Sequence, residues 1–308
     1  MLTLLGCKDL TGSTALPAGV ENPTYYSTPA GALGMASAAL YAVDTTLPGY
    51  IVDTGLLTDE LESNETGVPQ SILIGSGLPA SGSLDERILP EQAYGAQGTA
   101  ADQDFNGLNA IRGLVAQALG ALATYDTGAV KQGDPVAMRS ELYALDGYAE
   151  ILLADFFCSG IPLSTLEFQK DYTYRSGSPT DSVYKDAIYK LDTAYTLASA
   201  SDSAGLQNLA LVLKGRAWLD LGQYDSAAAA VAHVAEGFQD TLTLAIPEIL
   251  SHNPEFRWLN DVATVSDDEG ENGVEFLSNG DPRSASATES IPLNDLNGIE
   301  FFTVTFPA

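Results

Sequence analysis

The chain has few cysteines, few histidines and little positive charge. Its 308 residues include two cysteines and two histidines, and 13 basic residues stand against 41 acidic ones, giving a net charge of −28. Cys7 and Cys158 are too few for a disulfide framework, and neither lies at metal-ligand spacing from His233 or His252. The sequence therefore predicts no disulfide framework, no metal site and no cofactor, and we expect Cys158 to be a small buried apolar residue.

The acidic balance excludes several classes of partner. Binding to nucleic acid needs clustered Lys and Arg side chains to neutralise phosphates, and the chain has no such cluster. Docking by charge onto an anionic lipid surface is excluded for the same reason. No apolar run approaches the ~18 residues of a membrane span. Hydrophobic residues make up 45% of the chain, which is enough for a sizeable core.

Helical periodicity dominates the middle of the sequence. A first helix is expected from Thr28 and Pro29, an N-cap followed by the proline favoured at the first helical position, to about Pro48 and Gly49. Further helices are expected where apolar residues recur with a 3.6-residue period, over 104–125, from 134 to a stop at 160–162, from 178, over 205–221 and over 225–237. The fold class predicted is mainly α.

One predicted helix pair has a more specific pattern, "LKGRAWLDLGQYDSAAAAV" over 213–231. The spacing is typical of a tetratricopeptide-like helical hairpin, in which small residues allow close approach and an aromatic residue fills the groove. The residues in these roles are Gly215 for approach, Trp218 for the groove, Gly222 for the turn, Tyr224 packing back and Ala227 for contact. Trp218, Tyr148 and Tyr184 are all expected to pack within the helices.

Three segments lack helical periodicity. Residues 1–27 are interpreted as a signal remnant and tether, 50–101 as a long irregular insertion in the helical domain of 28–238, and 239–308 as the start of a less regular part. The last segment closes on a β-like run, "NGIEFFTVTFPA", for which the sequence offers no partner of obvious register. An irregular segment as long as 50–101 is usually functional or disordered.

Several of these stretches together resemble one known family. They are the lipobox-like Leu4–Cys7, "YAEILLADFFCSGIPLS" over 148–164, "SVYKDAIYKLDTAYTLA" over 182–198, and the hairpin of 213–231. This order is similar to that of the SusD/RagB family of outer-membrane nutrient-binding lipoproteins. The helix that runs into Gly-Ile-Pro-Leu is the most telling feature. Family members are usually longer and carry a full signal peptide, so we expect this chain to be a piece of a longer protein.

The resemblance implies an architecture, a location and a partner. It implies tetratricopeptide-like helix pairs that support a less regular, SusD-like ligand-binding part. It also implies a lipid anchor at Cys7 in the outer membrane, exposed at the cell surface, where two or more acyl chains give durable attachment. The partner implied is a SusC-like TonB-dependent transporter, to which the protein delivers glycans or peptides without doing chemistry itself.

Candidate ligand-binding residues are aromatics outside the helical periodicity, because sugar rings stack on aromatic faces while polar groups hold the hydroxyls. Tyr94 with Arg87 and Phe256 with Trp258 meet this description. The alternative for each aromatic is that it fixes a long loop to the helices. Residues 267–273, "DDEGENG", fail the spacing of a calcium-binding EF-hand loop, and no motif marks a pair of catalytic carboxylates.

Function follows as a hypothesis with two alternatives. The first hypothesis is a lipid-anchored protein that binds glycans or other nutrient oligomers. The second is a tetratricopeptide-type scaffold that binds a protein segment, which the irregular 50–101 disfavours. The third, an acidic hydrolase, has no motif in its support, so we expect no enzyme activity.

Overall fold

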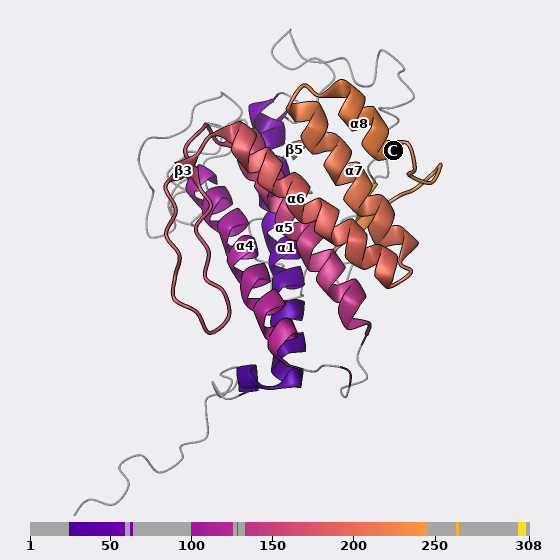
Figure 1. Ribbon diagram of the computed structural model, residues 1–308. Helices are drawn as coiled ribbons and strands as arrows, with labels where there is room; N and C mark the ends of the chain where they lie inside the picture. Colours follow the sequence, from indigo (N-terminus) through magenta and orange to yellow (C-terminus); the bar gives the residue numbers. More distant parts are fainter. Residues whose placement is uncertain are drawn as a thin grey trace, which may run out of the picture.

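The computed structural model describes residues 25–58, 62–63, 100–125, 128, 133–245, 263–264 and 301–305. In these ranges six α-helices pack against one another, which confirms the mainly α prediction (Figure 1). After a short 3-10 turn, η1 (Tyr25–Ser27), the helices are α1 (Pro29–Leu57), α4 (Ala100–Thr124), α5 (Pro135–Phe156), α6 (Thr180–Ala200), α7 (Ala204–Asp220) and α8 (Tyr224–Val231).

Three short antiparallel strand pairs accompany the helices. They are β1 (Glu62–Ser63) with β5 (Ala263–Thr264), β2 (Ile161–Pro162) with β3 (Gly177–Ser178), and β4 (Thr241–Ala245) with β6 (Phe301–Thr305). The last pair gives the C-terminal β-like run the partner that sequence reasoning did not find, with Thr241 opposite Thr305 and Ala245 opposite Phe301. Pairing across about 60 residues leaves no local signal, because strand register is fixed by tertiary contacts.

Each helix packs on the next in the chain, α1 on α4, then α4 on α5 and so on to α8. Figure 1 shows this order as a progression from indigo α1 to orange α7 and α8. The apolar stripes predicted from periodicity form the core. In α4 the apolar residues that recur at this spacing are all buried, namely Leu108, Ile111, Val115, Ala118 and Leu122. None of the helices in the described ranges has the length and apolarity needed to cross a bilayer.

Two helix starts follow the capping rules as predicted. The Thr28 hydroxyl accepts a hydrogen bond from the Gly31 amide at 3.0 Å, and Pro29 occupies the first helical position. Asp134 does the same for α5, accepting from the Val136 amide at 2.8 Å. Each side chain satisfies an amide that has no partner within its own helix.

The predicted end of the first helix at Pro48 and Gly49 is wrong. Helix α1 continues to Leu57, so 50–57 and 100–101 of the predicted irregular insertion are helical. Leu47 and Tyr50, on either side of the predicted break, are buried, and the Tyr50 hydroxyl donates to the Leu152 carbonyl at 3.2 Å. This packing against α5 offsets the hydrogen bond that a proline removes from a helix.

The predicted α7–α8 hairpin is confirmed in its close approach and its turn. A Cβ built on Gly215 would lie 2.5 Å from Cγ1 of Val231, so any larger residue there would force the Val231 side chain to move. Gly222 has a φ of +68°, the left-handed conformation that ends many helices. Trp218, like Tyr148 and Tyr184, packs against the core as expected.

Three details of the sequence interpretation are wrong. Tyr224 is 70% exposed and does not pack back, because it begins α8 on the outer side of the turn. Helix α8 ends at Val231, before the predicted Gly237. Cys158 is a free, exposed thiol, because α5 ends at Phe156 and Cys158 therefore lies beyond the buried face of that helix.

Candidate functional site

The predicted site residues Cys7, Arg87, Tyr94, Phe256 and Trp258 all lie outside the described residues. The structure nevertheless presents a candidate site of the same chemical kind, a pair of exposed tyrosines. It lies on the segment 161–178 between α5 and α6, which we call the tyrosine hairpin. In Figure 1 this hairpin starts near the β3 label and runs alongside α4.

The neck of the hairpin is built by the Gly-Ile-Pro-Leu motif that the sequence analysis singled out. Ile161 and Pro162 pair with Ser178 and Gly177, and the Gly160 amide donates to the Ser178 carbonyl at 2.9 Å. Gly160 has a φ of +109°, and a Cβ on Gly177 would lie 2.2 Å from the Gly160 carbonyl oxygen. Both positions therefore require glycine.

Helix α4 and Tyr125 after it hold the hairpin at residues 166–169. The backbone approaches so closely that a Cβ built on Gly120 would lie 2.7 Å from Cβ of Phe168. The Phe168 ring meets the Tyr125 ring edge-on with centroids 5.9 Å apart, and the Gln117 side chain donates to the Leu166 carbonyl. These contacts fix the hairpin on the helix.

Within the hairpin, backbone pairing sets the orientation of the tyrosines. Thr165 and Thr173 exchange two backbone hydrogen bonds of 2.8 and 3.1 Å. Tyr172 and Tyr174 flank Thr173, and alternate residues of an extended strand lie on one face. Their ring centroids are 4.5 Å apart. Tyr172 is 47% exposed and Tyr174 is 86% exposed. Two adjoining aromatic rings are thus exposed to solvent on a hairpin that α4 holds in place.

Such a surface can bind ligands with apolar C–H faces and hydrogen-bonding edges. Aromatic rings supply large contact area, and tyrosine adds a hydroxyl that donates or accepts. The adjacent Arg175 is exposed, and its guanidinium makes no ion pair within the described part of the chain. Lys170, by contrast, is paired with Glu167. Sequence reasoning missed the tyrosines, although "DYTYR" places two aromatics in alternation outside any helix.

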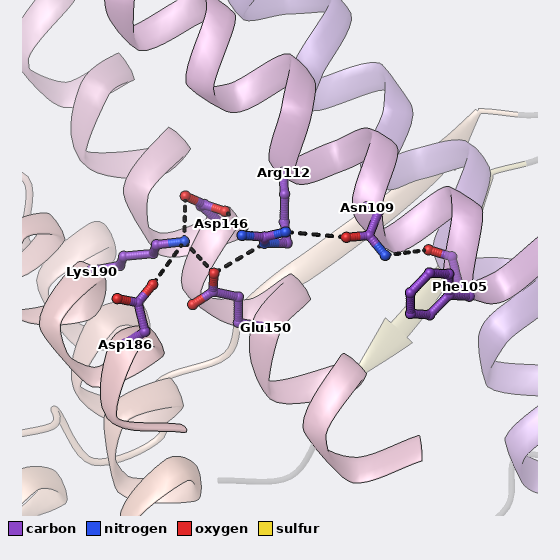
Figure 2. A network of polar contacts seen from close by, with 7 residues as sticks. All are labelled: Phe105, Asn109, Arg112, Asp146, Glu150, Asp186 and Lys190. Carbon is purple, nitrogen blue, oxygen red and sulfur yellow. Dashed lines mark hydrogen bonds and ion pairs between the residues drawn. The ribbon is translucent and has the colours of Figure 1, made fainter. Parts of the chain in front are cut away.

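A second polar cluster joins α4, α5 and α6, as Figure 2 shows. The Glu150 carboxylate is fully buried and accepts from Nε of Arg112 at 3.0 Å and from Nζ of Lys190. Lys190 also lies 2.9 Å from Asp146 and 3.4 Å from Asp186. Burial raises the pKa of Glu150 to about 8, with Lys190 and Arg112 acting in the opposite direction. This cluster is enclosed by helices, so it positions them and does not meet a ligand.

A third cluster lies where α5, α6 and α7 meet. The Tyr184 hydroxyl donates to one Asp155 oxygen at 2.6 Å, and the Arg216 guanidinium donates to the other. Both Asp155 oxygens are thus occupied by groups of the protein itself. The tyrosine hairpin is therefore the better candidate for ligand binding.

The fold and the hairpin define a mainly α-helical protein of consecutively packed helices that presents an aromatic surface on a braced loop. Comparison with protein-family models, curated proteins and solved structures finds no match to this chain.

Proposed function

We propose that this protein binds glycans or other nutrient oligomers at the cell surface and passes them to a TonB-dependent outer-membrane transporter. The observation that carries the proposal is the exposed pair Tyr172 and Tyr174 on a hairpin fixed to α4. Sugar rings present C–H groups on their faces and hydroxyls at their edges, which suits two adjoining aromatic faces that carry hydroxyls of their own. The protein acts by binding alone.

The sequence resemblance supports the same proposal. The Gly-Ile-Pro-Leu motif, the strongest point of similarity to the SusD/RagB family, forms the neck from which the tyrosines are presented. A lipid on Cys7 would hold the protein at the outer membrane, beside a SusC-like transporter. A strongly acidic protein of net charge −28 favours neutral ligands over acidic ones, because like charges repel.

The binding proposal is tested with the purified chain in native gels containing neutral polysaccharides, where binding slows migration. We expect retardation in at least one polysaccharide, and the double variant Y172A/Y174A to weaken binding at least about tenfold, or 1.4 kcal/mol. Y189A is the matched control, since Tyr189 is a 70% exposed tyrosine on α6, away from the hairpin. Equal retardation of both variants would place the ligand elsewhere.

The proposed delivery of ligand to a transporter needs a separate experiment. Full-length protein, purified from the membranes of its source under mild detergent, is expected to bring a large β-barrel partner with it. Recovery of the protein without such a partner, at a detergent level that preserves other membrane complexes, would contradict delivery to a transporter while leaving glycan binding standing.

A tetratricopeptide-type scaffold that binds a protein segment is the second candidate. The observation in its favour is the α7–α8 hairpin, which follows that spacing and exposes Leu219, Tyr224 and Val231. It predicts that a peptide ligand is lost in L219A and retained in Y172A/Y174A. The glycan proposal predicts that glycan binding is lost in Y172A/Y174A and retained in L219A.

A further inference from the structure

Tyr172 and Tyr174 form a contact between two exposed phenol rings on the tyrosine hairpin. Their ring centroids lie 4.5 Å apart, at the short end of the range of about 4.5–7 Å for aromatic pairs. Each of the other ring contacts in the described part of the chain includes a phenylalanine. A phenylalanine has no hydroxyl and is not oxidised to a phenoxyl radical, so among these contacts the tyrosine pair alone joins two groups that can be.

The relative position of the two rings resembles that of two phenols already joined by a carbon–carbon bond. Directly joined six-membered rings have centroids separated by two ring radii and one bond length, which is slightly less than 4.5 Å. The groups beside such a bond prevent the rings from lying in one plane, and the planes of Tyr172 and Tyr174 are inclined by 55°. Coupling therefore needs only a small movement, and exposed side chains move within picoseconds to nanoseconds.

Backbone pairing keeps the two rings together. Thr173 exchanges hydrogen bonds with Thr165, so the tyrosines on either side of Thr173 stay on one face of the strand. An oxidant in solution can reach both rings, because both are exposed. A ring held at contact distance reacts at a far higher effective concentration than a ring on another molecule. The net charge of −28 further opposes the approach of a second copy of the protein.

We propose that Tyr172 and Tyr174 are an oxidation site, at which hydrogen peroxide and a haem peroxidase join the two rings into a dityrosine bridge. Each phenol gives up one electron and its hydroxyl proton and becomes a phenoxyl radical. The two radicals form a bond between ring carbons next to the hydroxyls, and the hydrogens on those carbons then move to the oxygens. The bridge therefore contains two hydrogen atoms fewer than the two tyrosines, and one hydrogen peroxide is reduced to two waters.

The bridge changes how the surface of the hairpin behaves. Two separate rings turn independently to suit a ligand, whereas joined rings are held at one twisted angle. Oxidation thus converts an adaptable aromatic surface into a rigid one. The reaction itself needs no ligand, so it goes beyond the glycan proposal, and either proposal can fail without the other.

The test treats the purified chain, at low protein concentration, with a haem peroxidase and an equal amount of hydrogen peroxide. Dityrosine is detected by its fluorescence and located by mass spectrometry after digestion with trypsin, which cleaves after Lys170 and Arg175 and releases "DYTYR" as one peptide. We expect this peptide from the monomer to have two hydrogens fewer and to give no backbone fragments between its tyrosines. An unchanged peptide, with dityrosine only in dimers or in other peptides, would overturn the proposal.

Three variants test whether the ring contact is the cause. Y174F keeps the ring but removes one phenol, and it should abolish the bridge. Y189F is the matched control, because Tyr189 is an exposed tyrosine on α6, and it should keep the wild-type yield. T173Y/Y174F retains two tyrosines in the peptide but places the second phenol on the opposite face of the strand, so the bridge should be lost. A wild-type yield in T173Y/Y174F would also overturn the proposal, since proximity in sequence would then be sufficient.

Discussion

Gly177 is the single residue on which the neck of the tyrosine hairpin depends most directly. Its missing Cβ leaves room for the Gly160 carbonyl oxygen, which would otherwise lie 2.2 Å away. Since that atom belongs to the backbone, it cannot rotate aside as a side chain could. Replacing Gly177 should therefore change how the hairpin holds Tyr172 and Tyr174, although Gly177 does not contact their side chains.

We predict that G177A destabilises the protein by about 1–3 kcal/mol and reduces ligand affinity at least about tenfold. G113A is the matched control, because Gly113 lies within α4 with nothing inside 4 Å of an added Cβ. It should be neutral or stabilise by up to about 1 kcal/mol through helix propensity. Urea unfolding and the gel assay measure both effects, and wild-type affinity in G177A would contradict the role given to the neck.

Glu150 gives a second prediction at the scale of one residue. Its pKa in the folded state, about 8, is above its unfolded value near 4.5, so the folded protein holds more protons between these values. The contribution of this group to stability is full below pH about 4.5 and is lost as the pH rises through about 8. We expect E150Q to show a smaller fall in unfolding free energy from pH 5 to 8 than the wild type. If urea unfolding gave the same fall in unfolding free energy from pH 5 to 8 for E150Q and the wild type, the prediction would be refuted.

Among the elements, α1 shows where local sequence and tertiary packing disagree. Proline within a helix removes a hydrogen bond and costs about 3 kcal/mol relative to alanine, yet α1 passes through Pro48 and Gly49 to Leu57. We predict that P48A raises the urea midpoint, with a gain of about 1–3 kcal/mol. An unchanged or lower midpoint would mean that the helix is already adapted to the proline.

The sequence predicted the elements whose signals are local. Caps at Thr28 and Asp134, the apolar stripe of α4 and the small residue at Gly215 were all readable from spacing. The features that depend on contacts between residues far apart in the sequence were not predicted. The continuation of α1 and the β4–β6 pairing depend on residues far away in the sequence, which no short window of sequence contains.

The candidate site shows the same division. The sequence analysis looked for aromatics outside the helices but named other residues, and it used the Gly-Ile-Pro-Leu motif as a point of family resemblance, not as the neck of a site. The sequence did not reveal that Phe168 against Gly120 fixes the hairpin on α4, since the two lie 48 positions apart. Without that brace, Tyr172 and Tyr174 were indistinguishable from tyrosines of an ordinary loop. The predicted residues outside the described ranges stay predictions.

At the scale of the whole molecule, the charge of −28 implies self-repulsion in the folded state. Salt screens repulsion between exposed charges beyond a Debye length of about 10 Å at 0.1 M, and acts far less on buried pairs such as Lys190 with Asp146. We predict that raising NaCl from about 10 mM to about 500 mM increases the thermal unfolding midpoint. A lower midpoint in high salt would indicate that attractive surface ion pairs dominate.

The central claim is that ligand binds on the faces of Tyr172 and Tyr174. The most direct measurement is NMR of the protein with selectively labelled tyrosine, saturated with an oligosaccharide of the polysaccharide retained in the gels. The account predicts intermolecular nuclear Overhauser effects between sugar C–H protons and the rings of Tyr172 and Tyr174, and none to Tyr189. Contacts to other tyrosines alone, or binding with no contact to this pair, would contradict it.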